Sequence, residues 1–161
     1  MALSTGDTIP DVTLRTMTKD GPAPVGSREA LGTGTVVLFG VPGAFTPACS
    51  DRHLPEYVLR ADELRAKGVD TVACVSVNDA FVMDAWGRSR EVGDSVVMLA
   101  DGNGDFTRAV GLELDATGLG LGLRSKRYAA VLRDGVVQDI WVEAVPSDVV
   151  VSSADAVLKS L

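Results

Sequence analysis

The sequence contains little cysteine and histidine, and this shortage limits the kinds of site that the protein can contain. Two cysteines and one histidine in 161 residues do not supply the ligand spacing of a zinc site, so we expect no metal. They also supply no disulfide framework, and we therefore expect a reducing compartment, the cytoplasm. In such a compartment a cysteine is usually a small buried hydrophobic residue and sometimes a catalyst.

Long apolar runs and clustered positive charges are also missing. No window of about 18 uninterrupted apolar residues occurs, so we expect no membrane-spanning helix, and residues 1–10 lack the basic and apolar regions of a signal peptide. The chain has 15 Lys and Arg against 22 Asp and Glu, a net charge of −7. Nucleic acids and anionic membranes bind clustered Lys and Arg, so we expect neither as a partner. The length predicts one domain, residues 1–161.

Apolar periodicity predicts an alternation of strands and helices. Strands are expected at 11–17, 35–41, 69–77 and 95–101, with two more within 127–144 around the turn residues Asp134 and Gly135. Helices are expected at 46–67, 79–90, 104–112 and 147–161. This order predicts an α/β fold with a central mixed β-sheet and helices on both faces.

Three of the expected helices carry signals at particular residues. Pro55 should kink or split the helix at 46–67, because proline lacks the N–H that a helix interior uses. Asn78 and Ser147 are the expected caps of the helices at 79–90 and 147–161, since their side chains accept bonds from free backbone N–H groups.

The segment "FGVPGAFTPACSDRHLP", residues 39–55, places Cys49 at a helix start. Thr46 suits the N-cap and Pro47 the first helical position, which puts the sulfur of Cys49 in the first turn. Free N–H groups and the helix dipole favour an anion there, so we expect a reactive thiolate near neutral pH. A cysteine at a helix start is often only a packing residue, and the pattern alone leaves that alternative open.

A thiolate that attacks a substrate needs further groups around it. Thr46 is close enough in sequence to hydrogen-bond near the sulfur, and Pro42 and Pro47 would stiffen the loop. A cation is still required, and "LRSKRYAA" offers Arg124, Lys126 and Arg127. Arg127 stands at the mouth of an expected strand, and a guanidinium stays charged. The sequence pattern alone does not show that Arg127 lies next to Cys49 in the folded protein.

Other residues have less specific interpretations. His53 lies four positions after Cys49 on one helix face, and we expect a supporting residue rather than a general base. "GLGLGL" at 118–123 lacks the lysine of a phosphate loop, so we expect no nucleotide or other cofactor. Trp86 and Met83 are expected in the core or at an interface.

Three blocks of the sequence resemble the peroxiredoxin family. "PGAFTPACS" contains P-x-x-x-T-x-x-C, the peroxiredoxin active-site pattern, at Pro42, Thr46 and Cys49. Similarity to the peroxiredoxin 5 or type II branch covers three blocks: the longer run around this pattern, then "GVDTVACVSVNDAFVMDAW" (68–86), and then "SKRYAAVLRDGVV" (125–137). The resemblance extends from about residue 5 to the C-terminus. It implies a thioredoxin-like fold and a thiol peroxidase that reduces hydrogen peroxide and organic hydroperoxides in antioxidant defence and redox homeostasis.

The resemblance also implies roles for individual residues. Cys49 corresponds to the peroxidatic cysteine, which is oxidised to sulfenic acid, and Arg127 corresponds to the catalytic arginine. Thr46 and Pro42 match the remaining motif positions. The substrate pocket would involve the backbone N–H of Cys49 and the loop residues Gly43, Ala44 and Phe45. A homodimer is implied, with Phe45 and Phe81 as expected contacts.

The resemblance says less about how the oxidised Cys49 is reduced again after it has reacted with peroxide. Some members have a resolving cysteine near the C-terminus, where this chain has Ser152 and Ser153. Cys74 is the remaining candidate resolving cysteine, although its mid-strand position also suits a buried structural residue. The favoured expectation is a one-cysteine cycle with glutaredoxin and glutathione, or thioredoxin, as the reductant. Glu56 stands where the family more often has glycine.

Two other functions use the same cysteine. A thiol–disulfide oxidoreductase on this fold normally needs Cys-x-x-Cys, but Thr46 occupies the first cysteine position. A redox sensor or relay would need only a reactive Cys49, and the sequence leaves that as an additional role.

Overall fold

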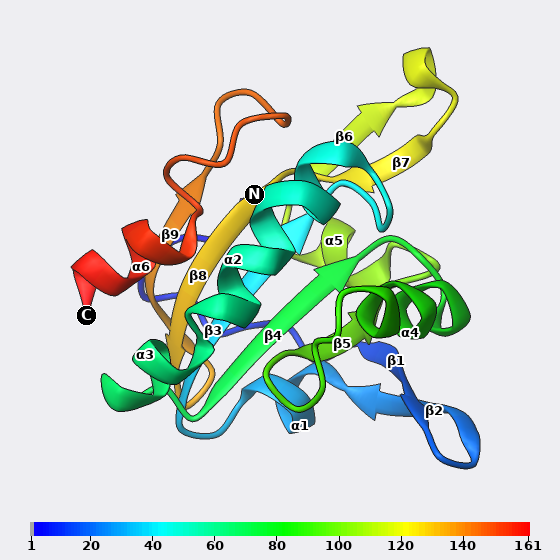
Figure 1. Cartoon of the computed structure of the whole chain (residues 1–161). Helices are drawn as coiled ribbons and strands as arrows, with labels where there is room; N and C mark the ends of the chain where they lie inside the picture. The colour runs from blue at the N-terminus through cyan, green and yellow to red at the C-terminus, as the bar shows by residue number, and fades with distance from the viewer. Residues whose placement is uncertain (1) are drawn as a thin grey trace.

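The computed structural model describes residues 2–161 and has a seven-stranded sheet at its centre (Figure 1). The strand order is β2-β1-β5-β4-β3-β8-β9. The strands are β1 (Thr13–Thr18), β2 (Gly21–Gly26), β3 (Thr35–Val41), β4 (Thr71–Ser76), β5 (Val97–Ala100), β8 (Tyr128–Arg133) and β9 (Val136–Val142). β3, β4 and β5 are parallel, whereas β8 pairs antiparallel with β3. The expected mixed sheet is confirmed.

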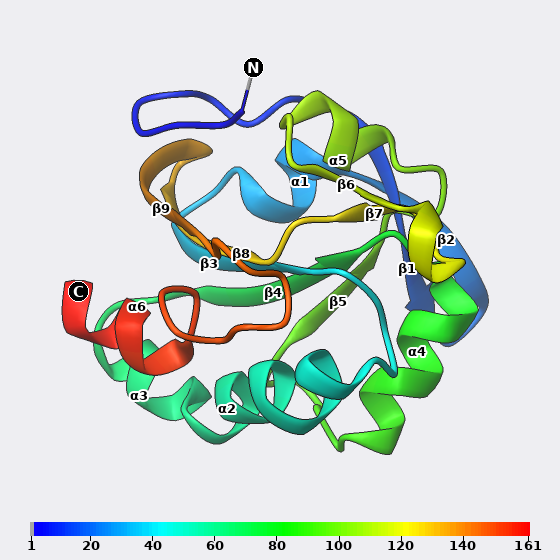
Figure 2. The same ribbon diagram turned by 90° about the horizontal axis from the view of Figure 1, so that it is seen from above.

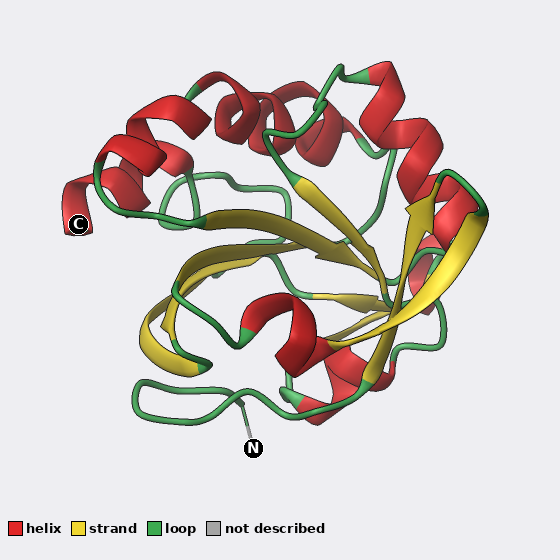
Figure 3. Cartoon of the chain, turned by 90° about the horizontal axis from the view of Figure 1, so that it is seen from below, coloured by secondary structure: helices red, strands yellow, loops and turns green. Residues whose placement is uncertain are grey.

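Helices cover both faces of the sheet (Figures 2 and 3). On one face lie α2 (Leu54–Leu59), α3 (Ala61–Ala66), α4 (Ala80–Ser89) and α6 (Ala154–Ser160). On the other lie α1 (Ser27–Leu31) and α5 (Asp105–Ala109). No helix within residues 2–161 is long and apolar enough to cross a membrane.

The central strand β3 contributes to the core on both sides. Val37, Phe39 and Val41 pack toward α2 and α4, while Val36 and Leu38 pack toward α1 and α5. Parallel strands that are covered on both faces have nearly continuous apolar sequences, which is why the run at 35–41 was readable from the sequence. Its predicted bounds agree with the structure.

Several elements outside the apolar runs were not predicted. β2, α1 and a separate hairpin of β6 (Glu113–Ala116) and β7 (Gly122–Ser125) have weak patterns, and a 3₁₀ turn, Thr117–Leu119, joins the last two strands. Figure 1 shows this hairpin projecting from the central sheet. The predicted turn between β8 and β9 is confirmed, because Asp134 (φ 49°) and Gly135 (φ 80°) both adopt the left-handed conformation of a tight hairpin.

The predicted C-terminal helix is confirmed, but its predicted start and both predicted caps are wrong. Only 154–160 is helical, and Ser153 caps it by accepting a bond from the Ala156 N–H. Ser147 lies in the preceding loop, where its carbonyl accepts a bond from Arg52. Asp79 caps α4 in place of Asn78 by accepting a bond from the Val82 N–H.

The helix changes type just before Pro55, where the sequence predicted a kink or split, but it does not end there. Residues 47–48 are helical, Cys49–His53 form a π-helical turn, and α2 follows from Leu54. In this turn the Leu54 N–H donates to the Cys49 carbonyl. Since Pro55 has no N–H to continue the α-helical ladder, the wider turn accommodates it without ending the helix. A second interruption, at Arg60, separates α2 from α3.

Candidate active site

The loop after β3 starts the helix that holds Cys49. The Thr46 carbonyl accepts a bond from the Ser50 N–H over 2.9 Å, so Thr46 begins the helix as predicted. Its hydroxyl donates to the Gly43 carbonyl over 2.7 Å and does not cap the helix. Phe45, between them, has a φ of 65° and an exposed side chain. The loop therefore turns sharply before Cys49.

The structure brings Arg127 to Cys49. Arg127 Nη2 donates to the Cys49 Sγ over 2.9 Å, and both residues are buried. A guanidinium keeps its positive charge at every physiological pH, and here it lies within hydrogen-bond distance of the sulfur. Arg127, the cation proposed from the sequence, therefore lies next to the sulfur.

Two further bonds fix the orientation of the Arg127 side chain. Its Nε donates to the Pro146 carbonyl over 2.8 Å, and its Nη1 lies 2.9 Å from His53 Nδ1. The guanidinium is planar, so contacts on two of its nitrogens determine where the third points. Here the third nitrogen points at Cys49.

His53 supports Arg127 as a neutral imidazole. Arg127 is only a donor, so His53 Nδ1 accepts its bond, and the ring proton resides on Nε2, which donates to the Ser152 carbonyl over 2.9 Å. Burial and the neighbouring Arg127 charge lower the pKa of His53 to about 3. A group with this pKa is a poor general base at neutral pH, which fits the expected supporting role.

Neighbouring elements brace the loop around Gly43 and Ala44. The Ala44 N–H donates to Asn78 Oδ1 over 3.0 Å, so that N–H is already engaged. A Cβ at Gly43 would lie 3.2 Å from Thr46 Cγ2 and 3.4 Å from Arg124 Nη1. Arg124 thus packs on the loop, and its Nη1 donates to the Val77 carbonyl. Lys126 is exposed.

Cys74 lies in the middle of β4, beside Phe39 of β3 and Met98 of β5. It is fully buried in the same core as Cys49, and both thiols are free. Burial, and then the nearby Cys49, raise the pKa of Cys74 well above its ordinary value. A thiol in this setting is unreactive in the folded protein.

Sequence reasoning missed the residues that support the site from a distance. Trp86, which is in the core as expected, donates from Nε1 to the Ser50 hydroxyl over 2.9 Å. Glu143 accepts bonds within the loop that supplies Pro146 and Ser152. These contacts join distant segments, and a local pattern carries no signal for them.

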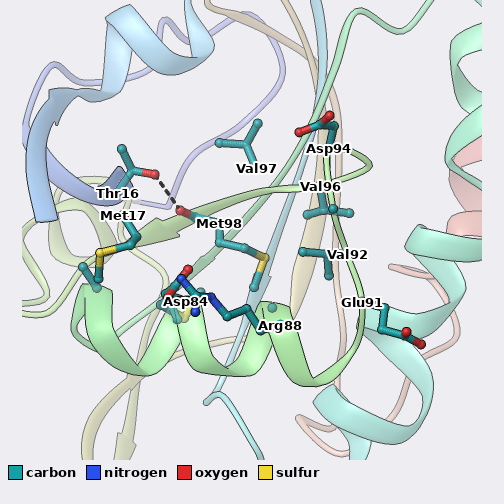
Figure 4. A pocket seen from close by; sticks show the side chains of 14 residues that line it. Thr16, Met17, Asp84, Arg88, Glu91, Val92, Asp94, Val96, Val97 and Met98 are labelled. Carbon is teal, nitrogen blue, oxygen red and sulfur yellow. Dashed lines mark hydrogen bonds and ion pairs between the residues drawn. The ribbon is translucent and has the colours of Figure 1, made fainter. Parts of the chain in front are cut away.

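Within residues 2–161, no group of three or more His, Cys, Asp or Glu side chains is placed to hold a metal ion. A cavity of about 380 Å³ lies between α4 and β5 (Figure 4). It is lined by Met17, Met83, Met98 and other residues, and none of the predicted site residues lines it.

Comparisons with known proteins match nearly the whole chain. The Redoxin family model matches residues 4–158. Peroxiredoxin-2B of Arabidopsis thaliana is 45% identical over 160 residues, which cover 99% of this chain and 98% of that protein. Reduced Prx3 of Vibrio vulnificus in complex with H₂O₂ has a TM-score of 0.93 at 49% identity, with 98% of each chain covered. Peroxiredoxin 5 of Alvinella pompejana has a TM-score of 0.85 at 35% identity, covering 98% of this chain and 97% of that one. The similarity therefore extends well beyond one motif.

Proposed function

Because this chain belongs to the peroxiredoxin family, in its type II and peroxiredoxin 5 branch, and is a thiol peroxidase that reduces peroxides through a cysteine, we propose that Cys49 is that cysteine. Its fold is the thioredoxin-like fold of this family. The observation that carries the assignment is the 2.9 Å contact between Arg127 Nη2 and Cys49 Sγ. It combines the nucleophile with a permanent cation.

The reaction begins when the Cys49 thiolate attacks one oxygen of the peroxide. An S–O bond forms as the O–O bond breaks, so sulfur loses two electrons and becomes sulfenic acid. The departing oxygen gains negative charge and takes up a proton, which gives water from hydrogen peroxide or an alcohol from an organic hydroperoxide. Arg127 stabilises the charge as it moves from sulfur to oxygen.

Thr46 orients the peroxide. Its hydroxyl proton is already donated to the Gly43 carbonyl, so its oxygen remains free to accept a bond from the O–H of the peroxide. Because the Ala44 N–H donates to Asn78, we assign the backbone donors of the pocket to Cys49 and Gly43. Pro42 stiffens the loop, and Phe45 forms its exposed rim.

A separate thiol protein completes the cycle. Cys74 is buried in mid-strand, which supports a structural role and a one-cysteine cycle with glutaredoxin and glutathione, or thioredoxin. Both cysteines are free, in keeping with the cytoplasm. The Cys49 turn must open before a protein thiol can reach the buried sulfur.

A homodimer is part of the proposal. Phe45 and Phe81 have exposed fractions of 55% and 66%, and such side chains favour burial against a second copy. Sedimentation that gives only a monomer at micromolar concentration would contradict this assembly.

The main test measures peroxide consumption coupled separately to glutaredoxin with glutathione and to thioredoxin. Cys49→Ser should abolish turnover, because serine oxygen does not replace the thiolate. Cys74→Ser is the matched control and should retain wild-type turnover with the better reductant. Full turnover by Cys49→Ser would disprove the assignment, and loss of turnover by a folded Cys74→Ser would make Cys74 a resolving cysteine.

A further inference from the structure

The loop between β9 and α6 contributes backbone carbonyl groups to the active site. The Pro146 carbonyl accepts the bond from Arg127 Nε. The Ser152 carbonyl accepts bonds from His53 Nε2 over 2.9 Å and from the Tyr57 hydroxyl over 2.8 Å. The position of this loop therefore affects both groups that orient Arg127.

A single buried carboxylate holds this loop. Glu143 has an exposed fraction of 7%, and its Oε2 accepts bonds from the Val150 N–H, the Ser152 N–H and the Ser152 hydroxyl, over 2.8, 2.8 and 2.6 Å. Burial alone would raise the pKa of Glu143, but the bonds from Ser152 and Val150 outweigh it and hold the pKa below its ordinary value. The carboxylate is thus stabilised by the loop that it organises.

Glu143 also contacts the backbone of the catalytic strand. Its N–H donates to the Arg127 carbonyl over 2.9 Å, so the two residues lie side by side at the end of the β8–β9 ladder. Glu143 thereby fixes the main chain of Arg127 directly and, through the loop, the carbonyls that orient its side chain.

We propose that Glu143 is a positioning residue for the peroxidase reaction, acting through the loop and His53 on Arg127. This inference rests on the proposed roles of Cys49 and Arg127. The Ser152 carbonyl accepts a hydrogen bond from the Nε2–H of His53, which leaves Nδ1 as the acceptor for Arg127. With the Pro146 carbonyl on Nε, this contact aims Nη2 at the sulfur.

Loss of the carboxylate would free the loop and let the guanidinium rotate. A displacement of about 1 Å in a catalytic group can cost about a hundredfold in rate. A merely structural Glu143 would instead lower the stability of the fold and leave the peroxide step of the folded enzyme unchanged. In the positioning role, the effect of a Glu143 substitution on the rate depends on the presence of Arg127. In the structural role it does not.

A double-mutant cycle separates the two roles. The second-order rate constant for oxidation of Cys49 by hydrogen peroxide is measured by stopped flow for Glu143→Ala, Glu143→Gln and Arg127→Lys, and for each Glu143 variant combined with Arg127→Lys. Lysine keeps the positive charge but lacks the fork that Pro146 and His53 orient. Glu113→Gln, on exposed β6, is the matched control.

We expect Glu143→Ala to lower the rate constant by about tenfold to a hundredfold and Glu143→Gln, which keeps an acceptor oxygen, by about threefold to tenfold. Both losses should shrink to less than about twofold in the Arg127→Lys background, and Glu113→Gln should react at the wild-type rate.

Two outcomes would overturn the role of Glu143. A different outcome would contradict the proposed role of Arg127. Wild-type rates for the folded Glu143 variants, or equal losses in both Arg127 backgrounds, would remove Glu143 from the reaction. If Glu143→Ala does not fold, the Glu143→Gln cycle decides alone. An Arg127→Lys enzyme as fast as wild type would instead contradict the catalytic role of Arg127.

Discussion

At the residue scale, the site consists of buried polar groups that are all paired. Arg127, His53 and Ser50 have exposed fractions of 3% or less, and within residues 2–161 no buried side-chain nitrogen or oxygen lacks a hydrogen-bond partner. A buried polar group that loses its partner keeps its desolvation cost. Each contact near Cys49 therefore contributes to stability as well as to geometry.

The bond from Trp86 to Ser50 illustrates this dependence. Ser50 follows Cys49 directly, and its hydroxyl accepts the Trp86 Nε1–H over 2.9 Å, which ties the Cys49 turn to α4. Trp86→Phe removes the donor and leaves the hydroxyl in the core. We expect the free energy of unfolding, from urea denaturation, to fall by about 1–3 kcal/mol.

Ser50→Ala provides the matched control for this bond. Alone it should also destabilise the protein, because it leaves the Trp86 Nε1–H without an acceptor in the core. It should cost less than Trp86→Phe, which in addition leaves a cavity where part of the indole was. The double variant should lose less stability than the sum of the losses in the two single variants. Strict additivity would show that the Trp86 bond does not stabilise the turn.

At the element scale, the pairing of β3 with β8 depends on a close approach at Gly40. Gly40 is directly opposite Tyr128, and a Cβ on Gly40 would lie 2.2 Å from Tyr128 Cε1. The ring therefore covers the glycine, and Tyr128 immediately follows Arg127. A side chain at position 40 would push the ring, and with it the start of β8, away from β3.

Gly40→Ala is expected to destabilise the protein by about 1–3 kcal/mol through overpacking. Gly118→Ala is the control, since nothing lies within 4 Å of a Cβ at that position, and it should change stability by less than about 0.5 kcal/mol. Thermal and urea unfolding of the two variants measure the difference. Equal stabilities would mean that Tyr128 relaxes without cost.

The elements that the sequence predicted were those with local causes. Strand β3 follows from an apolar run, and the helix start at Pro47 follows from Thr46 and the proline ring. The predicted helix at 147–161 begins late, at Ala154, because Glu143 binds the N–H groups of Val150 and Ser152 outside any helix. An acceptor that is distant from the segment leaves no periodic signal in it.

Within the candidate site, the sequence predicted the chemistry better than the contacts. The position of Cys49 in the first helical turn followed from capping rules, whereas its contact with Arg127 joins residues that are far apart in the chain and was reached only through family resemblance. The roles of Pro146 and Ser152 are carried by carbonyl groups, which every residue has. No residue type could have identified them.

At the scale of the whole molecule, one imidazole makes stability depend on pH. His53 is the only histidine of the chain, and burial and Arg127 lower its pKa from 6.5 to about 3. Between these values the unfolded chain binds a proton at His53 and the folded protein does not. Since stability rises with pH wherever the unfolded state binds more protons, acidification in this window favours unfolding.

The free energy of unfolding should accordingly level off above about pH 7.5 and fall progressively as the pH passes through 6.5, by at most about 1.4 kcal/mol per pH unit for this one group. Urea denaturation at a series of pH values from 7.5 to about 5 tests this before most carboxylates titrate. His53→Gln, which is neutral at every pH, should be less stable at pH 7.5 but lose less stability on acidification than the wild type. If both proteins lose the same amount between pH 6.5 and 5, the buried neutral imidazole is not the cause, and the tautomer that presents Nδ1 to Arg127 would lose its support.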